Sequence, residues 1–533
     1  MTQRIKGGIE MPADFTRFDL SKIRQIKQFK IDYETVKNFE TVVTRGPLLQ
    51  TYVDFVHLNP LVLMKTTEQP RPEFSDDLKH LRTESTFAFP KGKVIVLVNE
   101  GLYPAIKASV DQYVRDLAYE GYFASVYTVL RGTPAQLRNF LKGKRPIVGA
   151  VMVGSLPAAW YEDTDGAEFP CDLFFMDLDG DWKDTDHDGK YNEHTTNVLP
   201  EVWVGRLWTP TEGGNDAALI NDYFSRNHRF RKGRFGCSCE GLAYVDDDWS
   251  GFGDCALDMA IPAAGIEVVT DHTQTDGDRF KVELDQHRGW LQVCTHSNPG
   301  LHSFKVPGAP TEYVYNTYLR DTNAPNAYFY NLFACSSALF TQAEYMAGWY
   351  IFDKAGGQVS NGMAAVGSAK SGSMLYFENF YAPMGAGKVV GDAYVDWWKC
   401  LGLSHDANEI HWHYGMVLLG DPTMNWFTGA VPIPRTPRNG SVFDHFPRTM
   451  RLSWNPVPIA GAKYRVEIDA FGAKNAGKWA AETGQTWLVS GLLNTTGYDH
   501  VFVGAQRGRW RVRSIVNNIS APWSDWSYFR FTV

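Results

Sequence analysis

From residue 93 onward, short runs of apolar residues alternate with segments that carry a helical stripe. Residues 94–98 read Val-Ile-Val-Leu-Val, and residues 106–117 then place apolar side chains at helical spacing. A strand without polar positions is typical of a sheet covered on both faces. Because strands and helices alternate along the chain, the pattern predicts a mostly parallel sheet with helices on both faces. The predicted fold class is therefore α/β.

The same alternation continues to about residue 428. Further strands are predicted at 123–129, 147–153, 202–205, 242–245, 266–270, 290–295, 328–334 and 364–367. Helices are predicted at 134–141, 216–229, 338–354 and 389–399. We therefore place one α/β domain at residues 91–428. Residues 1–90, where Pro and charged residues interrupt short apolar pieces, are predicted to form an N-terminal extension or a small subdomain.

The composition changes after Asp421-Pro422. A Pro-rich linker is predicted at 429–437, and residues 438–533 then alternate apolar and polar positions between turn residues. This pattern predicts an all-β sandwich at the C-terminus. Trp454, Tyr464–Ile468 and Trp510–Arg513 resemble parts of a fibronectin type III-like module, which implies a binding or spacing role.

Composition narrows the possible partners of the 533-residue chain. A net charge of −8 disfavours a nucleic-acid partner held by bulk basic charge. The sequence has no apolar run of membrane-spanning length, so no membrane span is predicted. Its 7 cysteines are an odd number, which predicts at least one free thiol. Residues 1–30 lack the apolar stretch of a secretory leader, which predicts an intracellular protein or one whose leader has been removed.

Residues 177–193 form an acidic loop that reads DLDGDWKDTDHDGKYNE. Three alternating aspartates before Gly189 match positions 1, 3, 5 and 6 of a calcium loop. We predict that these three, with the carbonyl of Lys190 and with Glu193 in place of the missing final glutamate, hold structural Ca²⁺. Three earlier aspartates either complete this site or form a second one. The predicted ligands are Asp177, Asp179, Asp181, Asp184, Asp186, Asp188, Lys190 and Glu193. The alternative is a solvated acidic loop.

Two predicted strands end in residues suited to nucleophilic catalysis. Strand 290–295 leads into His296, and strand 328–334 leads into Cys335. Ligands of open α/β sheets bind at the carboxyl ends of strands, and a neighbouring imidazole raises the thiolate fraction of a cysteine. Backbone N–H groups near both residues would be candidates for an oxyanion hole. The alternative is an inert packed thiol and a histidine in an ordinary loop.

With these residues the chain resembles the gingipain family of cysteine peptidases, within the caspase-like clan. In that family a histidine and a cysteine follow successive apolar strands, as His296 and Cys335 do here. Residues 201–206 (EVWVGR) resemble its strand that ends in Gly-Arg, and residues 420–424 (GDPTM) resemble its Gly-Asp-Pro signature. The resemblance covers residues 91–428 and implies a caspase-like fold followed by a β-sandwich.

The resemblance also implies roles for matched residues. Cys335 would be the nucleophile, His296 the general base and acid, and Glu240 the group that orients His296. A carboxylate would bind Arg or Lys of the substrate. Asp254 fits that place best, with Asp246, Asp247 and Asp248 as competitors.

Three further residues would border the substrate: Ser297, Ser373 and Met374. Ser297 replaces the usual glycine, and Met374 stands where the family has an aromatic residue. These departures bear on the oxyanion hole and on a strict preference for arginine.

These observations favour a cysteine endopeptidase that cleaves polypeptides after Arg or Lys, with structural Ca²⁺ and no organic cofactor. The calcium and the resemblance favour a secreted or cell-surface protein, with a cytoplasmic one as the alternative. The rival function is a catalytically silent caspase-like scaffold whose β-sandwich binds a protein or surface partner. A carbohydrate-active enzyme would need carboxylates paired across a cleft, whereas the aspartates have metal-loop spacing. Four residues are predicted to be packing residues: His411, His413, Cys237 and Cys239.

Overall fold

The computed structural model describes residues 62–67 and most of residues 91–533. Within the latter range it leaves out 121, 165, 196–197, 212–215, 232–239, 262–264, 353–359, 406, 426–430, 439, 458–460, 473–477, 481–487, 517–518, 522 and 525. Most of the predicted N-terminal extension, part of the predicted linker, Cys237 and Cys239 therefore lie outside the described residues. The expectations for those segments stay predictions.

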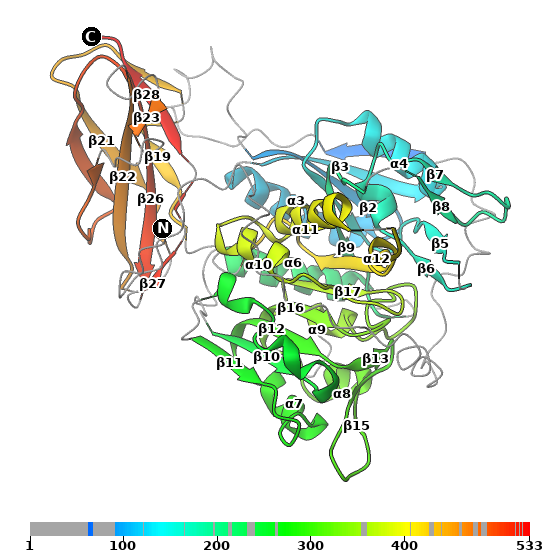
Figure 1. Cartoon of the computed structure of the whole chain (residues 1–533). Helices are drawn as coiled ribbons and strands as arrows, with labels where there is room; N and C mark the ends of the chain where they lie inside the picture. The colour runs from blue at the N-terminus through cyan, green and yellow to red at the C-terminus, as the bar shows by residue number, and fades with distance from the viewer. Residues whose placement is uncertain are drawn as a thin grey trace.

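A large central sheet organises the α/β region (Figure 1). Among the described residues its strands are β1 (Val62–Thr67), β2 (Gly92–Asn99), β3 (Tyr122–Arg131), β4 (Gly149–Val153), β9 (Trp203–Leu207), β10 (Gly241–Val245), β11 (Ile266–Val269), β12 (Arg288–Cys294), β16 (Ala327–Phe333), β17 (Ala364–Ser368) and β18 (Met416–Gly420). Their order across the sheet is β1-β3-β2-β4-β9-β18-β17-β16-β12-β10-β11. The predicted strands correspond to β2, β3, β4, β9, β10, β11, β12, β16 and β17, whereas β1 and β18 were not predicted. Apart from β11, most residues of the predicted strands are buried, as expected for a sheet covered on both faces.

The sheet is mostly parallel, with a reversal at β18 near its middle. Strands β3, β2, β4 and β9 are parallel to one another, and so are β17, β16, β12, β10 and β11. The reversal lies between β17 and β18, which pair in antiparallel fashion, and β1 adds an antiparallel edge beside β3. The prediction of a mixed α/β fold with a mostly parallel sheet is confirmed. The reversal was not predicted from the sequence.

Helices pack against both faces of the sheet. They are α3 (Tyr103–Tyr119), α4 (Pro134–Gly143), α5 (Leu173–Met176), α6 (Asp216–Arg231), α7 (Gly277–Leu284), α8 (Asn316–Asp321), α9 (Gly348–Ile351), α10 (Glu378–Gly385), α11 (Val390–Ser404) and α12 (Ala407–His411), with 3-10 turns η4 (Asp247–Phe252) and η5 (Leu257–Met259). Trp290 of β12 donates a hydrogen bond to Tyr381 of α10. Tyr330 of β16 contacts Tyr350 of α9. Because Trp290 pairs with Phe329, Tyr330 points to the opposite face from Trp290.

The helix predicted at 338–354 is wrong. Of its described residues, 338–352, only Gly348–Ile351 is helical, and Glu344 has a φ of 60°. Backbone N–H groups of this stretch donate to distant carbonyls, as Glu344 does to Pro210 and Met346 to Pro299. Tertiary hydrogen bonds thus replace the helical ones, and the apolar residues are buried without forming a helix.

Short antiparallel hairpins are inserted in the chain between strands of the main sheet. They pair β5 (Trp160–Glu162) with β6 (Glu168–Pro170) and β7 (Trp182–Lys183) with β8 (Glu193–His194). A three-stranded sheet of β13 (His296–Asn298), β14 (Leu301–Phe304) and β15 (Glu312–Tyr315) follows directly after β12. This small sheet holds the backbone from His296 onward, and the preceding Thr295 is bonded to Phe333 of β16.

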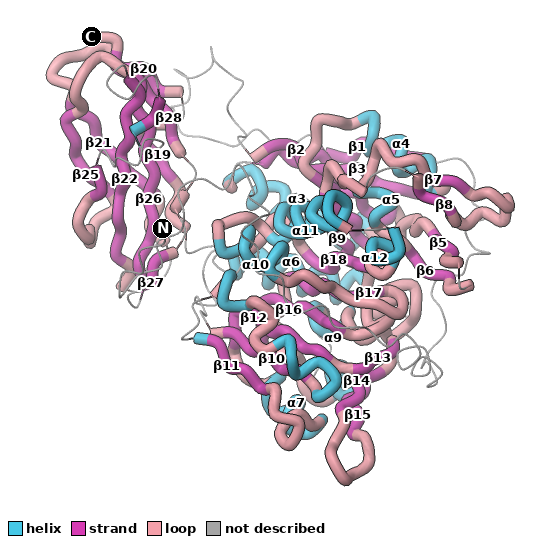
Figure 2. The backbone as a smooth tube through the Cα atoms, in the orientation of Figure 1, coloured by secondary structure: helices cyan, strands magenta, loops and turns pink. Residues whose placement is uncertain are grey.

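The C-terminal region forms separate β-sheets, visible beside the α/β region in Figure 2. Its strands are β19 (Pro434–Thr436), β20 (Ser441–Phe443), β21 (Thr449–Trp454), β22 (Lys463–Gly472), β23 (Lys478–Trp479), β24 (Leu488–Val489), β25 (Gly497–Val501), β26 (Arg507–Val516), β27 (Ile519–Ser520) and β28 (Ser527–Phe531). They form two sheets around a core of their own that includes Trp454 and Trp510. Pairing is antiparallel except between β20 and β28. The prediction of an all-β C-terminal region is confirmed.

A buried ion-pair network explains the Gly-Asp-Pro sequence at the end of β18. The carboxylate of Asp421 accepts hydrogen bonds from Tyr113 at 2.8 Å and Asn227 at 2.7 Å, and it pairs with Arg231 at 2.5 Å. Gly420 has a φ of 94°, and a Cβ there would lie 2.2 Å from the Met363 carbonyl oxygen. These residues therefore stabilise the α/β core.

No described helix is both long and apolar enough to cross a membrane.

Candidate active site

Three neighbouring parallel strands end together at one edge of the sheet. Val245 of β10 pairs with Cys294 of β12, and Cys294 pairs with Phe333 of β16. The ladder continues one residue further, because the N–H of Asp246 donates to the Cys294 carbonyl at 2.9 Å and the N–H of Thr295 donates to the Phe333 carbonyl at 3.0 Å. The residues that follow these three strands are therefore brought to one edge.

His296 is the second residue after β12 and is held by two residues of η4. Its Nε2 lies 2.7 Å from Asp248 Oδ2, and its ring centroid lies 4.6 Å from that of Trp249. The histidine is only 3% exposed, so the ring is enclosed on most sides. The hydrogen bond to His296 and the nearby ammonium of Lys305 lower the pKa of Asp248 to about 2. This carboxylate is thus ionised at neutral pH and available to an imidazolium.

Cys335 is the second residue after β16 and occupies the corresponding position on the adjacent strand. It is partly exposed, in contrast to the other described cysteines, which are buried. The N–H of the next residue, Ser336, donates to the Lys370 carbonyl at 2.9 Å, and Ser336 has a φ of 53°. The N–H of Ser336 is therefore engaged with the protein itself, which bears on the predicted oxyanion hole.

The prediction that Glu240 orients His296 is wrong. Glu240 precedes β10, and its carbonyl accepts the N–H of Gly289, so it lies at the amino end of the strands. His296 follows the carboxyl end of β12, seven residues beyond Gly289, which corresponds to about 20 Å along the strand. Asp248 takes the place expected for Glu240, because it follows the carboxyl end of β10 rather than preceding its amino end.

Ser297 is fully buried, and its hydroxyl is used inside the β13–β14 hairpin. Its Oγ donates to the Leu301 carbonyl at 2.9 Å and lies 3.1 Å from Nδ1 of His302. Burial lowers the pKa of His302 to about 3, so that ring is neutral. Ser297 is not among the non-glycine residues with positive φ. The backbone therefore does not require glycine at this position.

The other residues predicted to bind substrate have mainly structural contacts. Asp254 is partly buried and accepts the N–H of Ala256 at 3.0 Å, as a turn cap. Met374 is fully buried, with its sulfur 3.2 Å from the Asn331 amide. Ser373 is 1% exposed, and its carbonyl accepts the indole N–H of Trp412. Both residues are buried here, and that they border the substrate stays a prediction.

Asp246, the residue that follows β10, carries a buried carboxyl group. Its Oδ2 accepts the N–H of Lys305 at 3.2 Å, and it has no exposed surface. Burial, followed by the neighbouring Asp247, raises the pKa of Asp246 to about 8. Asp246 is therefore mostly protonated at neutral pH, and Asp248 is the charged carboxylate that contacts His296.

The acidic loop does not gather its aspartates at one point. Asp184 accepts the backbone N–H groups of Asp188 and Gly189 at 3.2 and 2.8 Å, so it caps the turn. Asp186 and Asp188 lie instead with Glu162, in a group whose ligand atoms are within 4.8 Å of one another. The Lys190 ammonium lies 2.8 Å from Asp188 Oδ2 and competes with any cation for that carboxylate.

A second acidic group lies at the start of the same loop. Asp177 and Asp179 lie with Glu201, again within 4.8 Å of one another. Asp177 is fully buried, its Oδ2 lies 2.9 Å from His194 Nε2, and its Oδ1 has no hydrogen-bond partner. Burial and the neighbouring Asp179 raise the pKa of Glu201, the effect of crowded carboxylates.

The remaining predicted ligands do not join either group among the residues that the structure describes. Asp181 accepts a hydrogen bond from Thr195 at 3.0 Å, and Glu193 pairs with Lys183 at 3.0 Å. Lys190 contributes an ammonium in the first group, and its carbonyl as a calcium ligand is not supported. Glu162 and Glu201 were missed, because they join the loop only through tertiary structure.

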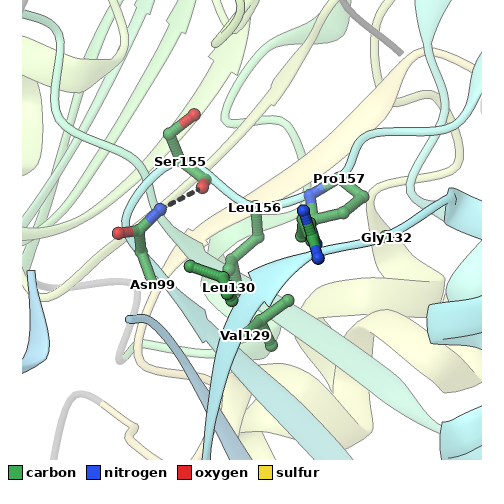
Figure 3. A pocket seen from close by; sticks show the side chains of 8 residues that line it. Asn99, Val129, Leu130, Gly132, Ser155, Leu156 and Pro157 are labelled. Carbon is green, nitrogen blue, oxygen red and sulfur yellow. Dashed lines mark hydrogen bonds between the residues drawn. The ribbon is translucent and has the colours of Figure 1, made fainter. Parts of the chain in front are cut away.

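A separate pocket lies at the carboxyl ends of β2 and β3, next to Leu156 and Pro157 (Figure 3). Asn99 donates a hydrogen bond across it to the Ser155 carbonyl at 2.9 Å. In the order of the sheet, four strands (β4, β9, β18 and β17) lie between β2 and β16. The pocket is therefore separate from the edge region that holds His296 and Cys335.

The packing roles predicted for His411 and His413 agree with their surroundings. His413 is fully buried, its Nδ1 lies 2.9 Å from the Glu409 carbonyl, and its ring contacts Trp397. His411 contacts Tyr414. Burial lowers the pKa of both histidines, and that of His413 to about 3, as expected for neutral core residues.

Comparison with known proteins assigns neither a family nor a function to the chain. No protein-family model matches the sequence, and no curated protein shows significant similarity to it. The functional argument therefore depends on the geometry at the ends of β10, β12 and β16.

Proposed function

We propose that this protein is a cysteine endopeptidase in which Cys335 attacks the substrate and His296 transfers protons. The observation that supports it best is the pairing of β12 with β16, which aligns the second residue after each strand. A partly exposed thiol, aligned on the neighbouring strand with an enclosed imidazole that is bonded to a carboxylate, is an arrangement suited to nucleophilic catalysis. The likeness to gingipains and to the caspase-like fold is part of this proposal.

Asp248 serves as the positioning residue in place of Glu240. Because Nε2 of His296 faces Asp248 Oδ2, Nδ1 is the ring nitrogen that would take the proton of Cys335. The charged carboxylate stabilises the imidazolium that forms with the thiolate. The fixed ring orientation and the contact with Trp249 reduce the reorganisation that proton transfer needs.

The reaction then follows in two stages. The Cys335 thiolate attacks the scissile carbonyl carbon, and His296 donates its proton to the leaving amine, which leaves a thioester. Water, deprotonated by His296, attacks that thioester and releases the new carboxylate and the thiol. Aspartates around this edge favour cationic substrates, so we propose cleavage after Arg or Lys.

Calcium has a structural role in this proposal. Asp177, Asp179 and Glu201 would hold one ion, since a buried carboxylate oxygen without a hydrogen-bond partner suits a hard cation. A second ion would need Glu162, Asp186 and Asp188, where Lys190 already supplies positive charge. Bound calcium would tie the acidic loop to β9 and supply no reactive group. Calcium dependence favours a secreted or cell-surface protein.

Hydrolysis of fluorogenic peptides that end in Arg or Lys tests the activity. We expect Cys335→Ala to reduce the rate to background, and Asp248→Asn to lower kcat/KM by about tenfold or more. Glu240→Gln is the matched control and keeps wild-type activity, because Glu240 lies at the other end of the strands. Equal rates for wild type and Cys335→Ala would reject the proposed nucleophile.

One observation favours a silent scaffold as the second candidate. His296 is almost completely buried, and the N–H of Ser336 donates to the Lys370 carbonyl. Both groups are therefore already engaged within the protein rather than open to a substrate. In that case the C-terminal β-sandwich would carry the function by binding a protein or surface partner. A peptidyl Cys-directed inhibitor separates the two candidates: labelling of Cys335 supports the peptidase, and no labelling with or without calcium supports the scaffold.

A further inference from the structure

Two buried thiols meet directly behind the candidate active site. The sulfur atoms of Cys255 and Cys294 lie 3.7 Å apart, and neither residue has any exposed surface. The amide of Gln292 also lies 3.5 Å from the Cys294 sulfur. The sulfurs are thus in contact inside the core, although the two cysteines are separated by most of the β10–β12 segment of the chain.

The two cysteines belong to the two segments that build the site. Cys294 is the last residue of β12, two positions before His296. Cys255 follows η4, the turn that carries Asp248 and Trp249, and its N–H donates to the Phe252 carbonyl at 2.9 Å. The beginning of this loop is already tied to β12, because Asp246 donates to the Cys294 carbonyl. A bond between the sulfurs would tie down its far end as well.

The geometry allows such a bond after a small movement. A disulfide needs sulfur atoms about 2.05 Å apart, so the pair must approach by about 1.6 Å. Cys255 lies in a turn between η4 and η5 rather than in a strand, with a φ of 53°. A shift there breaks no hydrogen bond of the main sheet, and β12 can keep its place.

We propose that Cys255 and Cys294 form a disulfide that fixes the loop carrying Asp248 to the strand that leads to His296. The oxidant is a small-molecule disulfide. The thiolate of one cysteine attacks it, forms a mixed disulfide and releases one small thiol. The second cysteine attacks the mixed disulfide, which forms the Cys255–Cys294 bond and releases a second small thiol. Two electrons and two protons thus pass from the cysteine pair to the small-molecule disulfide.

The bond forms during folding, before the pair is enclosed. Once the chain has folded, burial raises the pKa of the Cys255 thiol, which leaves little thiolate for exchange. The same burial protects the finished bond from reductants. A mild reductant therefore keeps the partly exposed Cys335 reduced while the buried disulfide persists.

Differential alkylation of the full-length protein tests the bond. The chain is folded in a buffer of reduced and oxidised glutathione, treated with mild reductant and unfolded in the presence of one alkylating agent. It is then fully reduced and treated with a second agent. We expect Cys255 and Cys294 to carry only the second label, and an unreduced digest to contain a peptide that joins them. Cys400, which is also buried, carries the first label. First-label modification of Cys255 and Cys294 overturns the proposal and indicates two packed thiols.

Thermal unfolding of variants gives a second, independent readout. Cys255→Ala and Cys294→Ala each remove the whole bond, so each lowers Tm by about 5 °C, and the double variant is no less stable than either. Two packed thiols would instead give additive losses in the double variant. Any change in peptide hydrolysis rests on the proposed function. Failure of that function leaves the labelling result intact, so the two failures are distinguishable.

Discussion

Replacement of Asp246 by asparagine tests whether the candidate site holds a protonated carboxyl group. Asp246 is fully buried, and burial and the adjacent Asp247 raise its pKa from 3.8 to about 8. Between about pH 4 and pH 8 the folded protein therefore keeps a proton that the unfolded chain has released. Since the folded state binds more protons, the free energy of unfolding falls as pH rises through this range. Asparagine does not titrate, so the variant lacks this loss.

The size of the effect follows from the width of the pH range. Each pH unit changes the free energy of unfolding by about 1.4 kcal/mol when one proton separates the two states. Between pH 5 and pH 8 the wild type should therefore lose at most about 4 kcal/mol relative to Asp246→Asn. Above about pH 8 both states are ionised and the difference becomes constant.

Urea unfolding at several pH values, followed by tryptophan fluorescence, measures this difference. Wild type and Asp246→Asn are compared from pH 5 to pH 9, and Asp278→Asn on the exposed side of α7 controls for the loss of one carboxyl group. We expect the Asp246 variant to gain stability over wild type as pH rises. A buried protonated Asp246 would be refuted if the free energies of unfolding of the two proteins changed in parallel with pH, or if the variant became less stable relative to wild type as pH rises.

Three further perturbations have defined outcomes. Asp248→Asn lowers kcat/KM by about tenfold or more while Glu240→Gln does not, and initial rates on Arg- and Lys-ended peptides measure this. Asp172→Ala leaves the fully buried Arg206, now paired with Asp172 at 2.5 Å, without its counter-charge, and urea unfolding should show a loss of about 3–5 kcal/mol. Excess chelator lowers the Tm of the wild type because bound calcium stabilises the folded state, whereas Asp177→Asn shows a smaller shift; equal Tm values of wild type with and without chelator would remove calcium from the proposal.

The positions of His296 and Cys335 could be predicted because strand ends are visible in the sequence. Each residue follows an apolar run, and the polar residue at its end marks the carboxyl edge of a parallel strand. Their alignment depends on which strands are neighbours. β12 and β16 follow one another in the main sheet, although β13–β15 and α8 lie between them in the chain, and successive strands are usually neighbours. The direction change between β17 and β18 leaves no comparable trace, because β18 returns from a distant part of the chain.

The wrong prediction that Glu240 orients His296 could have been avoided by the same reasoning from strand ends. The strand predicted at 242–245 places Glu240 before its first residue, and neighbouring parallel strands share their carboxyl ends. The histidine at the end of β12 therefore needed a partner after Val245, where Asp246, Asp247 and Asp248 stand. The family resemblance selected a residue by its local sequence, whereas the strand direction excluded it.

The spacing of aspartates in the sequence was also insufficient to predict which carboxylates of the acidic loop lie together. The alternation of aspartates at 184, 186 and 188 fits a calcium loop, but convergence depends on where each carboxylate finds its hydrogen bonds. Asp184 binds backbone N–H groups, and Lys190 supplies an ammonium to Asp188. The carboxylates that complete both acidic groups, Glu162 and Glu201, come from other elements. Such tertiary contributions have no signal in a short sequence window.

The charges at the strand ends limit which carboxylate can select the substrate. Asp246 is protonated and enclosed, and Asp248 already binds both His296 and Lys305, at 2.7 and 2.5 Å. A substrate cation at Asp248 would have to displace Lys305 and would weaken the hold on His296. In the proposed peptidase, recognition of Arg or Lys would therefore require Asp247 or Asp254 rather than Asp248, the residue proposed to position the base. Substitution of either would then raise KM for cationic peptides with little change in kcat, whereas substitution of Asp248 would act mainly on kcat.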